Sequence, residues 1–98
     1  MKLKKKIVLL KCTSSYPANV KELNLVSIPF LRKQFNCEVG FSDHTLGIGA
    51  AVAAVSLGAS VIEKHFTIDN NLPGRDNKFA ILPKMMSELS KTIKRYYL

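Results

Sequence analysis

The chain has 98 residues, 47% of them hydrophobic, so it forms at most one small domain and is too apolar for an intrinsically disordered segment. Fifteen Lys and Arg against seven Asp and Glu give a formal charge of +8, a balance often found in nucleic-acid-binding proteins. Nine of the basic residues precede Cys12 or follow Pro83, and the stretch between is neutral. No aromatic residues interleave with the charge as a nucleic-acid groove requires. We therefore expect solvated basic ends and no nucleic-acid partner, with a small basic nucleic-acid binder as the alternative.

Membrane insertion and a zinc site built on the two cysteines are not supported by the sequence pattern. The N-terminal lysines precede IVLL, an apolar run of four residues that is too short for a signal peptide. No stretch approaches the roughly 20 apolar residues of a membrane span. Cys12 and Cys37 have no zinc-ligand spacing and are expected to be reduced, half-buried thiols. These features favour a cytoplasmic protein without a membrane partner.

The first strand is predicted at Ile7–Leu10, an apolar run that ends in the turn-prone stretch KCTSSYP. A helix is expected within Asn19–Phe35. Because Pro29 lacks the N–H that bonds back one turn, it cannot lie deep inside this helix, which should therefore begin near Leu25. The side chains expected to face a core are Ile28, Leu31 and Phe35.

Two further strand and helix units follow. Val39–Phe41 is the second predicted strand, and the small-residue helix Gly49–Leu57 should end at Gly58. Ser60–Phe66 is the third and clearest strand. The last helix is expected to open at Pro83, a favoured first-turn residue. Its apolar stripe consists of Met86, Leu89, Ile93 and Tyr96.

Alternation of strands and helices predicts an α/β fold with parallel strands joined by right-handed crossovers. Three such units are too few to close a (β/α)₈ TIM barrel, which needs about 200 residues or more. We therefore expect a partial (β/α)₈ barrel of about three units.

Polar residues collect where the predicted strands end. In a parallel sheet these ends share one face, where active sites are built. The three groups are Thr13, Ser14, Ser15 and Tyr16; Ser42, Asp43 and His44; and Glu63, Lys64 and His65.

The two histidines follow neighbouring strands. Alternation puts Glu63 and His65 on one face of the third strand and Lys64 on the other. His44 and His65 could then face each other and bind Mn, Fe, Co or Zn, with nearby carboxylates favouring the harder ions. Histidines that only form hydrogen bonds within the scaffold are the alternative.

Two other motifs are weaker. Gly47 and Gly49 form a GxG, but Val52 replaces the third glycine of a dinucleotide-binding fingerprint, which we discard. Nothing in the sequence marks Cys12 as an activated nucleophile.

Three stretches, LLKCTSSYPA, VGFSDHTLGIGAAVAAVSLGASVIEKHFTID and LPGRD, closely resemble the sialic acid synthase family. These nonulosonate synthases make N-acetylneuraminate, legionaminate or pseudaminate. The resemblance spans about Ile7 to Ile93, and the combination of SDHT and EKHFT at this separation is highly specific.

The resemblance implies that phosphoenolpyruvate attacks the aldehyde of an open-chain N-acetylated amino sugar, such as N-acetylmannosamine or a bacterial analogue. Water then attacks the pyruvyl C2 and phosphate leaves. A divalent metal, typically Mn²⁺, polarises the aldehyde oxygen. By the matching motifs, His44 and His65 are the metal ligands, and Glu63 orders metal-bound water or the pyruvyl group.

Four more residues acquire roles from the same resemblance. Ser42 and Ser14 help to hold phosphoenolpyruvate, although many relatives carry asparagine at the position of Ser14. Tyr16 and Asp76 touch the sugar.

The resemblance also implies that residues 1–98 are a fragment of the barrel domain. Family members are about three times longer, with earlier barrel strands and a C-terminal antifreeze-like domain, and the full-length enzyme forms a homodimer. The fragment alone is expected to be inactive. A noncatalytic remnant or interaction module, pairing with a separately encoded N-terminal half, is the alternative.

Overall fold

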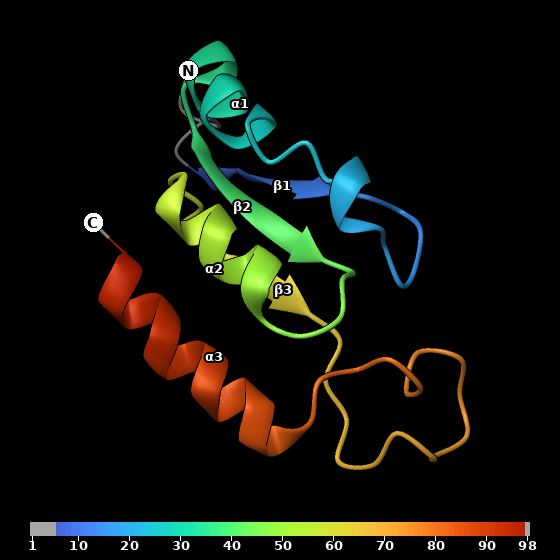
Figure 1. Cartoon of the computed structure of the whole chain (residues 1–98). Coiled ribbons are helices and arrows are strands. Elements are labelled where there is room, and N and C mark those ends of the chain that lie inside the picture. Colours follow the sequence, from blue (N-terminus) through green and yellow to red (C-terminus); the bar gives the residue numbers. More distant parts are fainter. Residues whose placement is uncertain (1–5, 98) are drawn as a thin grey trace.

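The computed structural model describes residues 6–97 (Figure 1). Three strands alternate with helices in the predicted order. The elements are β1 (Val8–Cys12), the 3₁₀ turn η2 (Val20–Glu22), α1 (Ser27–Phe35), β2 (Glu38–Asp43), α2 (Gly49–Ser56), β3 (Ile62–Lys64) and α3 (Pro83–Tyr96).

The strands form one parallel sheet in the order β1-β2-β3. Cys12 pairs with Ser42, and Ser42 pairs with Glu63. The carboxyl ends of all three strands therefore lie at one edge of the sheet, as α/β connectivity requires. The predicted α/β fold with parallel strands is confirmed.

The strand boundaries differ from the predicted ones. β1 is shifted and β2 is longer, because pairing with a neighbour extends strand geometry through polar residues such as Lys11 and Asp43. β3 is shorter than Ser60–Phe66: after Lys64 the chain leaves β2, and Phe66 forms an isolated parallel bridge to Ile81 instead.

Helix α1 begins two residues later than expected, at Ser27, so Pro29 lies in its first turn, where its missing N–H matters least. Ile28 is fully buried and Leu31 packs against the core. The prediction for Phe35 is wrong: it is 48% exposed, because the helix ends there and Asn36 turns the chain in the left-handed conformation.

The other two helices agree more closely with the sequence. α2 ends at Ser56, and Gly58 has the positive φ (103°) that the predicted stop needs. α3 opens at Pro83 and buries Leu89, with Met86 and Ile93 beside it. Tyr96 is wrong as a core residue: it ends the helix and is 52% exposed.

Helices α1 and α2 pack against one face of the sheet, and α3 packs against α2 (Figure 1). Val39 and Phe41 point into this face and are fully buried. Around them lie Ala18, Leu23, Ile28, Ala54 and Ala59. A second cluster joins α2 to α3 through Ala51, Ile81 and Leu89.

The opposite face, here called the open face, is not covered by the described residues. Val8, Leu10 and Val61 on it are 46%, 39% and 41% exposed. At its centre is Gly40, where an added Cβ would lie 2.5 Å from the Val61 carbonyl oxygen. Glycine at this position is therefore needed for the close approach of β2 and β3.

Most basic residues at the chain ends are exposed as expected, but Lys11, in β1, is half-buried. Lys84, Lys91, Lys94 and Arg95 are exposed, as is Lys6, whereas Lys2, Lys4 and Lys5 lie outside the described residues. Both cysteines are free thiols; Cys37 is half-buried as expected, but Cys12 is exposed on the open face. None of the helices within residues 6–97 has the length and hydropathy that a membrane span requires.

Candidate active site

His44 and His65 come together at the carboxyl ends of β2 and β3. Their ring centroids are 5.5 Å apart and the ring planes are inclined by 31°. The backbone of each histidine is held: the His44 carbonyl accepts from Ala18 N–H and the His65 carbonyl from Ile81 N–H, both at 2.8 Å. The predicted convergence of the two imidazoles is thus present in the fold.

Tyr16, in the loop after β1, packs against both imidazoles. Its ring centroid lies 5.4 Å from that of His44 and 4.7 Å from that of His65. Its hydroxyl donates to the backbone carbonyl of Asp76 at 2.9 Å. Burial raises the pKa of Tyr16 above its usual 10.0, and the negative charge of Asp76 raises it further. The phenol therefore remains a proton donor at neutral pH.

A cavity of about 290 Å³ opens in front of the histidines and is lined by Ser42, His44, Glu63, Lys64 and His65. Within it the Ser42 hydroxyl donates to a Glu63 carboxylate oxygen at 2.7 Å. The alternation predicted for β3 is confirmed here, because Glu63 faces Ser42 while the Lys64 ammonium bonds to Asp43. The cavity thus combines two imidazoles, a carboxylate and a hydroxyl.

The loop between β3 and α3 brings Asp76 to the site, and Asn70 organises this loop. The Asn70 amide donates to the carbonyls of Asn77 and Ala80, at 2.8 and 2.9 Å. The Asp76 side chain itself is exposed. Tyr16 and Asp76 are therefore neighbours, as their shared assignment to the sugar requires, but their direct contact is through the Asp76 backbone.

Ser14 also lies outside the histidine cavity. It is exposed in the loop after β1 and is not among the residues that line the histidine cavity. Its assigned role stays a prediction.

The histidine pair fits a divalent metal. Metal–imidazole bonds of about 2.1 Å allow two rings on one ion to lie roughly 5–6 Å apart between centres, close to the observed 5.5 Å. Nδ1 of His44 is buried and has no hydrogen-bond partner among the described residues. Leaving a buried nitrogen without a partner costs free energy, and a bound ligand would remove this cost. Residues 6–97 contain no cluster of three His, Cys, Asp or Glu ligands, so any further ligands must come from elsewhere.

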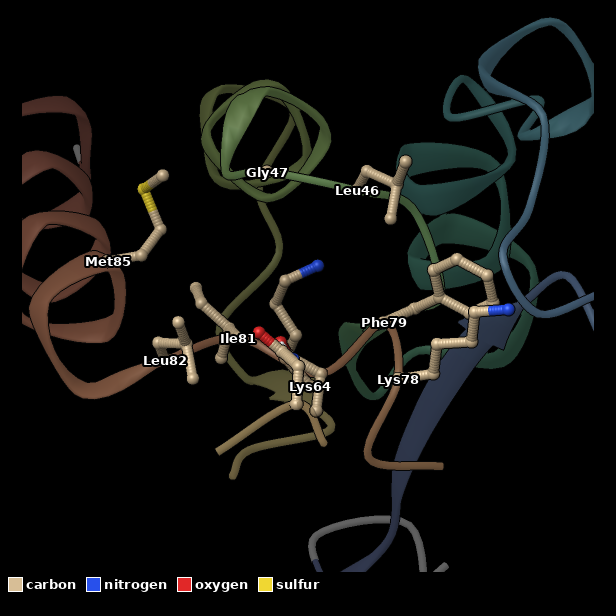
Figure 2. Close-up of a pocket in the computed structure, with 10 residues that line it drawn as sticks. Leu46, Gly47, Lys64, Lys78, Phe79, Ile81, Leu82 and Met85 are labelled. Carbon is tan, nitrogen blue, oxygen red and sulfur yellow. Dashed lines mark hydrogen bonds between the residues drawn. The ribbon is translucent and has the colours of Figure 1, made fainter. Parts of the chain in front are cut away.

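A second cavity of about 250 Å³, mostly apolar, lies beside Lys64 (Figure 2). Leu46 and Gly47 bound it on one side and Ile81, Leu82 and Met85 on another. It contains neither histidine and none of the residues assigned to substrates. The residues assigned to the metal and to catalysis line the histidine cavity instead.

Comparison with known structures identifies the class of fold. The chain superposes with a TM-score of 0.89 on a crystal structure of N-acetylneuraminic acid (sialic acid) synthetase from Leptospira borgpetersenii in complex with citrate. The two are 39% identical, and the match covers 97% of this chain and 33% of that one. The three β/α units are thus part of a (β/α)₈ barrel of the kind found in sialic acid synthases.

Sequence comparison then gives the family. The NeuB family model matches residues 1–98, and the chain belongs to the NeuB family. It is 47% identical to N,N'-diacetyllegionaminic acid synthase of Campylobacter jejuni over 89 residues, covering 91% of this chain and 27% of the relative. It is 51% identical to pseudaminic acid synthase of the same species over 75 residues, covering 76% and 22%. The chain therefore spans about a quarter of the length of the curated relatives it matches.

Three residues beside the histidines were not assigned any role from the sequence. Asp43, Thr45 and Lys64 form a buried polar network behind the site. Strand alternation could have identified Asp43 and Lys64. They carry opposite charges, each directly precedes a histidine, and both fall on the helix-covered face. The sequence contains this alternation, but it does not show that both charges are buried.

Proposed function

We propose that this chain carries the metal-binding part of a nonulosonate synthase active site. The reaction joins phosphoenolpyruvate to an N-acetylated amino sugar and releases phosphate. The observation that carries the proposal is the pair of imidazoles 5.5 Å apart at adjacent parallel strand ends, facing the cavity that Glu63 and Ser42 also line. The named synthases among the relatives support the reaction class.

In this proposal His44 and His65 hold a divalent cation, Mn²⁺, which supplies Lewis-acid polarisation of a substrate oxygen when bound. The remaining roles in binding and orienting the substrates are assigned to Glu63 and Ser42. Glu63 orients a water or the pyruvyl group. The Ser42 hydroxyl, which now donates to Glu63, must turn from it to donate to an anionic phosphoenolpyruvate oxygen.

Sugar binding is assigned to Tyr16, whose ring contacts both imidazoles, and to Asp76 beside it. The raised pKa of Tyr16 keeps its hydroxyl protonated, so it can exchange the Asp76 carbonyl for a sugar hydroxyl. The Asp76 carboxylate is exposed and free to accept from a second sugar hydroxyl. Ser14 is proposed to reach phosphoenolpyruvate from the loop after β1. A cytoplasmic location and a homodimer of the full-length enzyme complete the proposal.

The test combines this chain with a protein that supplies the remaining barrel strands of a family member. Phosphate release from phosphoenolpyruvate is measured with N-acetylmannosamine and with diacetylated bacterial analogues as acceptors. Release that requires an acceptor and Mn²⁺, and that is lost in the His44→Ala chain, is the expected result. Acceptor-independent release, or none with any acceptor, would refute the synthase assignment.

A second candidate function is a noncatalytic module that pairs with a separately encoded half-barrel. The exposure of Val8, Leu10 and Val61 favours pairing, because the open face presents contiguous apolar side chains to a partner. The same mixing experiment separates the two: complex formation without phosphate release supports the noncatalytic module, and release supports a split enzyme.

A further inference from the structure

Behind the histidine cavity, the residues that precede the two histidines form a buried ion pair. Lys64 Nζ lies 3.1 Å from Asp43 Oδ2, with side-chain exposures of 5% and 0%. Asp43 and Lys64 are also register partners at the ends of β2 and β3. Because Asp43 precedes His44 and Lys64 precedes His65, the ion pair ties together the two strand ends from which the imidazoles extend.

Thr45 closes the network on the other side of His44. Asp43 Oδ1 accepts from the Thr45 N–H at 2.8 Å and from the Thr45 hydroxyl at 2.6 Å. Lys64 Nζ in turn donates to the Thr45 carbonyl at 2.6 Å. Figure 2 shows the Lys64 side chain extending toward the backbone at Leu46 and Gly47. The residues on both sides of His44 are thus bound to one ammonium group of β3.

Such a network is not explained by stability alone. A buried ion pair loses hydration on both partners, and apolar residues of the same volume often stabilise a fold as well or better. Its clear physical consequence is geometric. With both Asp43 oxygens and the Lys64 ammonium engaged, the spacing of the two strand ends is fixed from the face opposite to the Ser42–Glu63 hydrogen bond.

The network also sets the charge near the cavity. Lys64 lines the histidine cavity, and an uncompensated ammonium there would repel a cation held by the imidazoles. Asp43 is fully buried and bonded to Lys64, so it cancels this charge in a region where water screens little.

We propose that Asp43, Thr45 and Lys64 are positioning residues that fix the separation of His44 and His65, and that Asp43 cancels the Lys64 charge so that the pair can bind a divalent cation. The part concerning the cation rests on the proposed function. The part concerning the separation of the rings does not.

The first experiment is a double-mutant cycle on Mn²⁺ affinity, measured by electron paramagnetic resonance on the chain combined with the protein that supplies the remaining barrel strands. Asp43→Asn should weaken binding by about tenfold or more, because it leaves the Lys64 charge uncompensated. Lys64→Met should weaken it less, and the double variant should bind better than Asp43→Asn alone. If the network served stability only, the folded variants would keep the wild-type affinity.

The matched control is Arg32→Met. Arg32 forms an ion pair with Glu38 at 3.2 Å, at the opposite end of β2. This variant also removes a cation that pairs with β2, but far from the histidines, so Mn²⁺ affinity should stay within about twofold of wild type. A loss equal to that of Asp43→Asn would assign the effect to general strand damage and overturn the inference.

The second experiment needs no metal. Nuclear Overhauser effects between the ring protons of His44 and His65 should be present in the wild-type chain and in Arg32→Met, and lost or weakened in Asp43→Asn and Lys64→Met. Should Asp43→Asn fail to fold, Thr45→Val removes only the hydroxyl donor and should produce a smaller change of the same sign.

The two experiments separate the two proposals. A wild-type chain that binds no Mn²⁺ even when combined with the remaining barrel strands, but whose ring contacts depend on Asp43, refutes the metal site and retains the role in ring spacing. A chain that binds Mn²⁺, with affinity and ring contacts unchanged in all three network variants, retains the metal site and overturns the inference.

Discussion

His44 and His65 hold their places through backbone contacts as well as through the strands. Each carbonyl is bonded to a different loop, at Ala18 and at Ile81. An imidazole can therefore be removed without releasing the backbone that carries it. Any loss of activity on removal of either ring should therefore come from the missing imidazole and not from misfolding.

The first prediction follows from this. In a full-length barrel, His44→Ala or His65→Ala should reduce the rate of phosphate release by about 100-fold or more, because either change removes half of the protein's proposed metal ligands. Circular dichroism should show a folded protein. Near-normal activity in either variant would contradict the ligand assignment.

Tyr16 gives a prediction on pH dependence. Because its pKa is raised in the folded protein, the fold holds the phenol proton more tightly than the unfolded chain does. The contribution of Tyr16 to stability is therefore complete below about pH 10 and is lost as pH rises through the raised pKa. Urea unfolding at a series of pH values should show a steeper alkaline loss for wild type than for Tyr16→Phe.

The control for this measurement is Tyr97→Phe, which removes an exposed phenol (59%) outside the site. It should keep the wild-type alkaline profile. Equal alkaline profiles for wild type and Tyr16→Phe would contradict a raised pKa of Tyr16 in the folded protein.

Among the elements, β2 is the central strand, and its register with β3 determines which side chains enter the cavity. Register depends on Gly40, since an added Cβ would also lie 2.7 Å from Leu10 Cδ2 and 2.9 Å from Val61 Cβ. A shift of β3 by one residue would exchange the faces of Glu63 and Lys64.

We therefore expect Gly40→Ala to destabilise the fold by about 1–3 kcal/mol, the usual cost of overpacking, measured by denaturant unfolding. The matched control is Gly49→Ala at the start of α2, where nothing lies within 4 Å of an added Cβ. This substitution should be neutral or stabilise by up to about 1 kcal/mol. Equal effects at both positions would show that the approach of β3 to β2 is not limited by Gly40.

At the scale of the whole molecule, the dominant feature is a sheet covered on one face. The radius of gyration of 14.0 Å exceeds the roughly 13 Å of a compact domain of this length. β1 and β3 are both edge strands among the described residues, and the open face between them exposes Val8, Leu10 and Val61. Uncovered edges and apolar faces promote association.

The chain by itself should therefore self-associate, with a concentration-dependent sedimentation coefficient at micromolar concentration. A Val8→Lys, Val61→Lys double variant should shift the distribution toward monomer by adding charge to the open face. Val20→Lys is the control, since Val20 is 69% exposed but lies on η2, away from the open face. A monomeric wild-type chain would contradict this prediction.

Much of the fold and part of the site could be predicted from the sequence. The order of strands and helices, the start of α3 at Pro83 and the stop at Gly58 follow from local rules on apolar runs, proline and glycine. The meeting of His44 and His65 follows from a parallel sheet, because both residues come directly after a strand. These features depend on neighbouring residues or on the two-residue alternation of a strand, so they can be inferred from composition and spacing.

Tertiary structure decided the rest. The lengths of β2 and β3 depend on pairing, and the exposure of Phe35 and Tyr96 depends on where each helix leaves the core. The burial of Asp43 against Lys64 and the contact of Tyr16 with both imidazoles are long-range. The absence of Ser14 from the cavity lining is long-range too. No local pattern fixes them, because each depends on which segments distant in the chain pack together and exclude water.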